Sequence, residues 1–281
     1  MAIALSPAWL HAQEVRLFDA DGKQVANYDE LIDPKNLHYG DVLVFSDGAR
    51  FEFQSIMNHG NTTLILEVVS KDTPPFRTPM ALRIPLKSGD FQSVSGRKAP
   101  FTSFIDSTIQ GRPALEEEGL PIPKLYRQQA GQYIALEKVA ADFDLDDLLA
   151  RPEEILEKYR SLEILEEAEA ALYKFGKQAA KFHTIGDFSA GQLTYSIERK
   201  QWYLLDWTKD HQRAKWYVTR YDLHLFDKYF GIFTSPPSDA SRKTRILERL
   251  RAIQDHQLRQ RRRLGCIVEL VEDTFGRIRK P

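Results

Sequence analysis

The character of the sequence changes near residue 140, and this change constrains the fold more than any other feature. Before that point, short apolar or alternating runs are separated by turn residues: 41–45, 50–54, 63–69, 80–84 and 132–139. Each run has the length and the β-branched or aromatic content of a strand. After that point, apolar residues recur at helical spacing, most clearly in an amphipathic helix expected over 162–182. The sequence therefore predicts an α+β protein whose first part is antiparallel and β-rich and whose second part is mainly helical.

Turn residues divide the first part into its expected strands. Asp47-Gly48 is a hairpin signal, and 58–61 contains a second turn around Gly60. The segment 101–118 is expected to be helical in part, despite two helix-breaking residues.

Composition excludes some classes of protein and leaves others open. The 281 residues, 42% of them hydrophobic, are enough for a sizeable core, and the net charge of -1 points to no particular partner. The single cysteine, Cys266, excludes a disulfide framework. No apolar run reaches the ~18 residues of a membrane helix, and residues 1–13 lack the basic leader of a signal peptide. We therefore expect no transmembrane segment and a cytoplasmic location, in the producing cell or, for a secreted effector, in a host.

Two aspartates, an amide and a hairpin follow the predicted helix. Asp187 is followed by Gln192 five residues later, and a predicted hairpin over 192–205 ends at Asp206. Phosphoryl transfer needs a carboxylate that orients the attacking hydroxyl and oxygen ligands that hold Mg²⁺. Taken singly, either aspartate would as readily cap a loop or a helix. Together, they predict a phosphotransfer core.

This arrangement resembles the catalytic loop of the kinase and aminoglycoside-phosphotransferase-like superfamily, including its atypical bacterial branches. Aminoglycoside and choline kinases have His-Gly-Asp and Asp-Trp in these places, where this chain has Gly-Asp187 and Asp206-Trp. The resemblance implies a bilobal protein-kinase-like fold, with an N-terminal extension over 1–40, an N-lobe over 41–139 and a C-lobe over 140–281. It also implies that Asp187 is the catalytic aspartate and Asp206 a Mg²⁺ ligand. Gln192 stands where the family has Asn and would be a second ligand on a longer arm.

The resemblance also assigns a cation and its partner in the first part. Met80-Ala-Leu-Arg83 lies where the family has Val-Ala-Ile-Lys, so Arg83 would bind the nucleotide phosphates and assist catalysis. The alternative is an ordinary surface arginine on a strand. Asp106 would be the acidic helix partner of this cation, with Glu116 as the alternative, although both acids would also suit a solvated surface.

Three further residues are expected at the nucleotide. Gly60 would lie in the turn that covers the phosphates, although a plain hairpin turn explains it as well. Glu137 and Val139 would form the hinge whose main chain binds adenine, although an edge strand leading to a helix would look similar.

Basic residues are concentrated late in the chain: Arg242, Lys243, Arg245, Arg249, Arg251, Arg259, Arg261, Arg262 and Arg263. On helices they would make a basic face for a polyanion, such as an inositol phosphate, an acidic partner or lipid head groups. The alternative is a solvated helix paired with the acidic middle of the chain. No nucleic-acid partner is expected, because no recognised nucleic-acid module accompanies these residues.

The sequence as a whole predicts an ATP- and Mg²⁺-dependent kinase that transfers the γ-phosphate to a hydroxyl of a protein or a small molecule. A pseudokinase that binds nucleotide or a partner is the main alternative, and Gln192 and Arg83 favour it. Retention of Asp187 and Asp206 favours the enzyme. A third alternative is a kinase-fold nucleotidyltransferase that transfers AMP.

Overall fold

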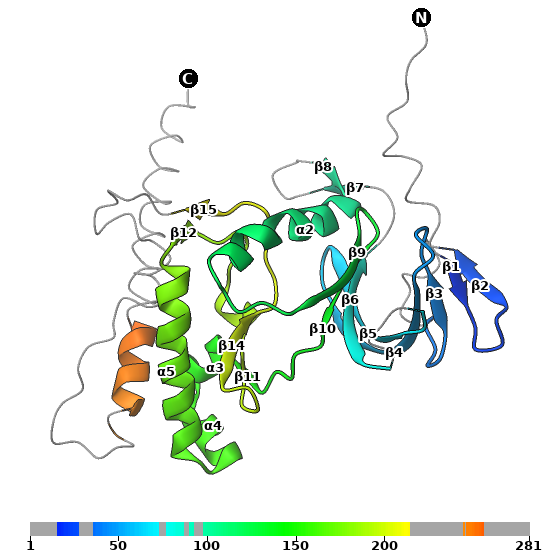
Figure 1. Cartoon of the computed structure of the whole chain (residues 1–281). Coiled ribbons are helices and arrows are strands. Elements are labelled where there is room, and N and C mark those ends of the chain that lie inside the picture. The colour runs from blue at the N-terminus through cyan, green and yellow to red at the C-terminus, as the bar shows by residue number, and fades with distance from the viewer. Residues whose placement is uncertain are drawn as a thin grey trace, which may run out of the picture. The chain divides into compact units, whose positions relative to one another are not determined.

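The computed structural model describes residues 16–27, 36–72, 77–86, 90–92, 98–213, 244 and 246–255 (Figure 1). The chain forms two compact units, Met1–Pro113 with Pro123–Val139, and Ala114–Ile122 with Ala140–Pro281. The fold is mixed α+β, with one large antiparallel sheet and several helices. Residues 1–13 and Cys266, which the sequence analysis discusses, lie outside the described residues.

The first unit is built on an eight-stranded sheet in the order β2-β1-β3-β4-β5-β6-β10-β9. Its strands are β1 (Arg16–Phe18), β2 (Gln24–Asn27), β3 (Val42–Val44), β4 (Arg50–His59), β5 (Thr63–Ser70), β6 (Pro79–Pro85), β9 (Leu125–Gln129) and β10 (Tyr133–Glu137). All neighbouring strands pair antiparallel. A separate pair joins β7 (Asp90–Gln92) to β8 (Lys98–Pro100), and α2 (Thr102–Glu117) follows in the chain.

The strand predictions from 41 to 139 are confirmed by β3, β4, β5, β6 and β10. The Asp47-Gly48 turn joins β3 to β4, with Gly48 at a φ of 80° that glycine adopts easily. The sequence interpretation missed β1 and β2, although Asp21-Gly22 between them is the same kind of hairpin signal. It also expected helix in only part of 101–118, whereas α2 is continuous with Pro113 inside it.

The core of the first unit lies against one face of the sheet. Leu17, Leu43 and Phe51 are aligned across β1, β3 and β4, and each is 1% exposed or less. The same cluster continues through β5, β6 and β10 with Leu66, Leu82 and related residues. Burial of each such side chain stabilises the fold by about 1.5–3 kcal/mol before entropy is counted.

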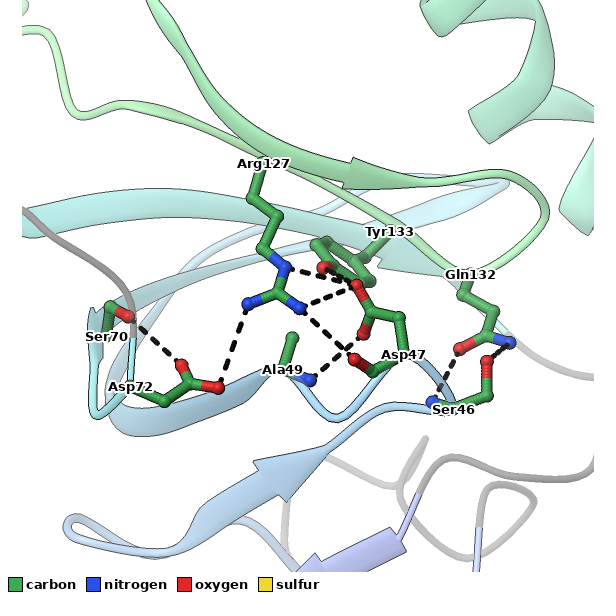
Figure 2. Close-up of polar contacts among 8 residues, drawn as sticks. All are labelled: Ser46, Asp47, Ala49, Ser70, Asp72, Arg127, Gln132 and Tyr133. Atoms are coloured by element: carbon green, nitrogen blue, oxygen red, sulfur yellow. Dashed lines mark hydrogen bonds and ion pairs between the residues drawn. The ribbon is translucent and has the colours of Figure 1, made fainter.

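A polar network shows that the sheet curls over this core (Figure 2). Asp47, in the β3–β4 turn, accepts hydrogen bonds from the Tyr133 hydroxyl of β10 at 2.8 Å and from Arg127 Nε of β9 at 3.1 Å. Arg127 also reaches Asp72, beyond the end of β5, at 3.7 Å. The ring of Tyr133 packs on Phe45 with centroids 4.3 Å apart. Because β5 and β6 separate β4 from β10 in the sheet, these contacts require strong curvature.

Between residues 140 and 213, the second unit contains three α-helices and two small sheets. Its elements are β11 (Phe143–Asp144), α3 (Leu145–Ala150), α4 (Pro152–Tyr159), α5 (Leu162–Ala179), β12 (Phe182–Thr184), the 3₁₀ turn η3 (Ala190–Gln192), β13 (Leu193–Ser196), β14 (Gln201–Leu204) and β15 (Gln212–Arg213). One sheet has the order β11-β13-β14, and the other pairs β12 with β15. The indole N–H of Trp202 donates to the carbonyl of Ala168 at 2.7 Å and fixes β14 against α5.

Two helix boundaries follow from local chemistry. The Asp144 side chain accepts the Asp147 N–H at 2.7 Å and caps α3. The predicted helix over 162–182 ends earlier, at Ala179. Phe182 instead belongs to β12, where its buried side chain continues the apolar pattern that suggested a longer helix.

Residues 246–255 are helical, and two arginines join them to acidic residues of the same unit. Arg249 pairs with the buried Glu169 of α5, and Arg251 pairs with Glu153 of α4 at 2.7 Å. For these two arginines, the structure shows the alternative to a polyanion-binding face, which was pairing with the acidic middle of the chain. The other basic residues of the predicted face, Arg242, Lys243, Arg245, Arg259, Arg261, Arg262 and Arg263, lie outside the described residues. Within the part of the chain that the structure describes, no helix is long and apolar enough to cross a membrane.

Candidate phosphotransfer site

Main-chain hydrogen bonds join the two segments that carry the predicted aspartates of the second unit. We call these bonds the hydrogen-bonded frame. Leu205 N–H donates to the carbonyl of Gln192 at 2.9 Å, which extends the β13–β14 pairing. Thr208 N–H donates to the carbonyl of Gly186 at 3.1 Å. Asp187 directly follows Gly186, and Asp206 directly follows Leu205. The fold therefore brings both aspartate segments together although the two aspartates are nineteen positions apart in the sequence.

Gly186 allows this close approach. A Cβ on Gly186 would lie 2.3 Å from Thr208 Oγ1, and 3.0 Å from both the Thr208 carbonyl oxygen and the Asp210 nitrogen. The Gly186 N–H donates to Nδ1 of His211 at 3.1 Å, so this nitrogen acts as an acceptor. The other side of His211 packs edge-on against Phe182, with centroids 5.7 Å apart. Only glycine fits at this position without displacing the segment after Asp206.

Asp187 has a strained main chain. Its φ is 59°, in the left-handed region, within a turn that the Phe188 N–H closes on the carbonyl of Ile185 at 3.2 Å. Left-handed geometry costs an L-residue about 1–2 kcal/mol, although Asp tolerates it better than most. The side chain is exposed, whereas Ile185 below it is buried. Such strain at a non-glycine residue is typical of functional loops.

Asp206 is half-buried, between the end of β14 and the fully buried Trp207. Leu204, the last residue of β14, is also fully buried. Two anchored apolar side chains therefore fix the main chain on both sides of this carboxylate.

Gln192 forms a reciprocal cap with Ser189. Its Oε1 accepts the Ser189 N–H at 2.8 Å, and the Ser189 side chain accepts the Gln192 N–H in return. This capping box holds η3 together. The amide oxygen that was predicted to bind Mg²⁺ therefore has one of its two lone pairs engaged.

The candidate site offers few protein ligands to a Mg²⁺ ion. Over the described residues, no three His, Cys, Asp or Glu side chains converge as metal ligands would. Mg²⁺ commonly uses only one or two protein carboxylates and takes its other ligands from substrate phosphates and water. Asp206 suits that role, and the free lone pair of Gln192 suits a weaker second position.

Acidic residues at the start of α3 lie beside η3. A Cβ on Gly191 would lie 3.5 Å from Asp146 Oδ2 and 3.9 Å from Asp144 Oδ2. Burial raises the pKa of Asp144, and the neighbouring Asp147 and Asp146 add to this effect. The carboxylates at the start of α3 therefore pack beside the loop that carries Gln192.

In the first unit, Arg83 lies on β6 opposite Ile65 of β5 and Ile134 of β10. Its side chain is 5% exposed, so the alternative of an ordinary surface arginine is wrong. Asp106 accepts the Gly131 N–H at 2.7 Å and thus holds the β9–β10 turn.

The remaining predicted residues are used locally. The Gly60 N–H donates to the Thr63 carbonyl at 3.0 Å and closes the β4–β5 hairpin, which leaves it unable to donate to a phosphate in this arrangement. Glu137 ends β10, and its carboxylate accepts the Lys124 N–H at 3.3 Å. Val139 is 7% exposed and lies two residues after the end of β10.

No family model matches this chain, and no curated protein is significantly similar to it.

The sequence interpretation also missed four residues that shape the loop: Gly186, Ser189, Thr208 and His211. Two of them carried a readable signal. Ser189-x-x-Gln192 is a capping-box pattern, and a glycine beside a candidate catalytic residue commonly marks a close approach.

Proposed function

We propose that this chain is a phosphotransferase with a protein-kinase-like fold, which uses ATP and Mg²⁺ to phosphorylate a hydroxyl. The observation that carries the proposal is the hydrogen-bonded frame that joins the Asp187 turn to the Asp206 segment. Phosphoryl transfer depends on positioning and electrostatics more than on covalent chemistry, and it needs these two carboxylates held close together.

The order of elements supports the same proposal. The β4–β5 turn with Gly60 precedes β6 with Arg83, and then come α2, the β9–β10 pair and the hinge candidates. In the second unit, α5 precedes the Asp187 turn, and the β13–β14 hairpin precedes Asp206. This is the order that the resemblance implies. The buried Arg83 adds support, because a buried arginine commonly serves a specific ionic partner.

Each residue then has a chemical role. Asp187 would orient the acceptor hydroxyl and take its proton as the oxygen bonds to the γ-phosphorus and ADP leaves. Asp206, assisted by Gln192, would hold Mg²⁺, which when bound neutralises charge on the nucleotide phosphates. Arg83 would bind the phosphates that are not transferred.

A binding module without phosphotransfer is the second candidate, and one specific observation favours it. Gln192 completes a local cap instead of presenting a fully available ligand oxygen. A pseudokinase would keep this cap and bind nucleotide or a partner without turnover.

The test is an assay with ATP labelled on the γ-phosphate, using Mg²⁺ and generic acceptors, including the protein itself. Asp187→Asn and Asp206→Asn are compared with wild type. Asp21→Asn, on an exposed turn of the other unit, controls for the loss of one carboxylate. Thermal unfolding of each variant checks that it is folded.

Mg²⁺-dependent labelling that is lost in both site variants and kept in the control would support the enzyme. Nucleotide binding without labelling would favour the pseudokinase. Label that appears only from α-labelled ATP would point to AMP transfer. If the chain binds no nucleotide in calorimetry, the proposal fails.

A further inference from the structure

A pocket lies on the first unit, on the face of the sheet opposite the core. It has a volume of about 570 Å³, and β1, β3 and β4 form its floor. The turn around Gly22, Gly40 before β3 and Lys71 after β5 form its rim. This volume is in the range of small-molecule sites.

The strand register explains which side chains meet there. Arg16, Val44 and Arg50 are aligned across β1, β3 and β4. In the next row, Phe18, Val42 and Glu52 are aligned on the same face. Adjacent strands are about 4.8 Å apart, so the two arginines start about 10 Å from each other and can converge on one ligand.

The acidic residues of the pocket already have partners. The Asp19 carboxylate accepts the N–H groups of Asp21 at 3.1 Å and Lys23 at 2.8 Å. Glu52 pairs with Lys71, and this hydrogen bond lowers the pKa of the Glu52 carboxyl. The pocket cations left over are therefore the two arginines.

Within the described ranges, the Arg16 and Arg50 side chains make no hydrogen bond or ion pair. Their two positive charges match a phosphomonoester, which carries about -1.5 to -2 at neutral pH. Each arginine guanidinium can donate two N–H groups to two phosphate oxygens. The three terminal oxygens of a phosphomonoester can therefore bind two arginines better than the two oxygens of a carboxylate can. Phe18, Val42 and Val44 offer an apolar surface beside the charge.

We propose that this pocket binds a small phosphomonoester with a flat apolar body, the phosphate on Arg16 and Arg50 and the body on Phe18, Val42 and Val44. This site is separate from the proposed phosphotransfer residues and does not depend on them. It is a binding site, and no chemical step is assigned to it.

The test is calorimetric titration of the full chain with phenyl phosphate. Arg16→Gln and Arg50→Gln each remove one fork, and Arg151→Gln removes an exposed arginine from the other unit as a matched control. Inorganic phosphate measures the contribution of the apolar body, and benzoate tests whether a monoanion suffices. Because Arg16 and Arg50 are exposed, their variants should unfold at the wild-type temperature.

We expect saturable binding of phenyl phosphate that weakens about tenfold or more in each pocket variant and is unchanged in the control. Inorganic phosphate and benzoate should bind more weakly than phenyl phosphate. The proposal is overturned if phenyl phosphate fails to saturate up to about 10 mM. It is equally overturned if the control weakens binding as much as the pocket variants, or if benzoate binds as tightly as phenyl phosphate.

Discussion

Replacing Gly186 with alanine tests whether the frame around the two aspartates depends on close main-chain approach. The new Cβ would lie 2.3 Å from Thr208 Oγ1 and 3.0 Å from two main-chain atoms of the 208–210 segment. A rotamer change of Thr208 relieves the first contact but not the other two. The segment must therefore shift, and its hydrogen bonds to Gly186 at 3.1 Å must weaken.

The size of the effect follows from these contacts. Overpacking of this kind costs about 1–3 kcal/mol. Each of the two strained hydrogen bonds contributes about 1 kcal/mol. Because the shift that relieves the clash also breaks the bonds, the terms overlap, and we expect a loss of about 2–4 kcal/mol in the free energy of unfolding.

Gly191→Ala is the matched control, in the same loop. Its Cβ would meet only Asp146 Oδ2 at 3.5 Å and Asp144 Oδ2 at 3.9 Å, which are ordinary contacts. Its φ is not positive, so this variant should be close to neutral or slightly stabilised. Chemical denaturation of both variants measures the difference. Thr208→Ala, added to Gly186→Ala, should recover part of the loss, because it removes the shortest contact.

Equal stability of Gly186→Ala and Gly191→Ala would refute the reasoning, since only the first position is crowded. A loss in Gly186→Ala that Thr208→Ala does not reduce at all would place the cause elsewhere than in the 2.3 Å contact. If the proposed function holds, Gly186→Ala should also lose phosphotransfer at temperatures where it remains folded.

Three further predictions concern single side chains. Tyr133→Phe should lower the free energy of unfolding by about 1–2 kcal/mol at neutral pH, because the Tyr133 hydroxyl donates to Asp47. Burial raises the pKa of Tyr133, so the advantage of wild type should shrink above pH ~10, where the tyrosine of the unfolded chain ionises. A difference in denaturation midpoints that stays constant with pH would contradict this. Arg249→Gln should lower the free energy of unfolding by about 3 kcal/mol, because it leaves Glu169 charged and unpaired. Glu169→Gln should lower it only slightly, since burial raises the pKa of Glu169 even beside this arginine. A larger loss in Glu169→Gln than in Arg249→Gln, measured by thermal unfolding, would contradict this. Asp187→Gly should keep or raise the free energy of unfolding by up to about 1 kcal/mol, and a clear loss would show that the side chain is structural.

The sequence was most informative where a local pattern fixes the structure. The strand β5 and the helix α5 were readable because a period of two or 3.6 in apolar residues leaves few alternatives. The end of α5 was not, because Phe182 continues the apolar pattern after the helix has stopped. Short strands such as β1 gave too few residues for a period to appear.

The curvature of the sheet was beyond sequence reasoning for a different reason. It depends on contacts between residues about eighty positions apart, such as Asp47 with Arg127 and Tyr133. Each of these residues has an ordinary strand or turn pattern around it. Nothing local distinguishes a tyrosine that closes a curled sheet from one that lies on a flat one.

Within the candidate site, the residue types were predictable but their uses were not. Gln192 was interpreted as a metal ligand because of its spacing from Asp187, yet its spacing from Ser189 specified a cap. Two patterns overlapped on one side chain, and only coordinates show which hydrogen bond forms. The pocket between Arg16 and Arg50 was likewise hidden, because it depends on the register of strands that the sequence did not reveal.

In the Gly186-Asp187 turn, glycine occupies the position before the left-handed residue and aspartate occupies the left-handed position itself. Conformational ease alone would place glycine at position 187, where φ is 59°. The chain has aspartate there, and it has glycine one residue earlier, where φ is not positive but a side chain has no room. The glycine is explained by packing against the 208–210 segment. Aspartate tolerates this conformation better than most residues but less well than glycine, and packing does not require it because the residue is exposed. A non-glycine residue held in this conformation motivates a hypothesis of function, and the proposed phosphotransfer gives this carboxylate a role toward a ligand.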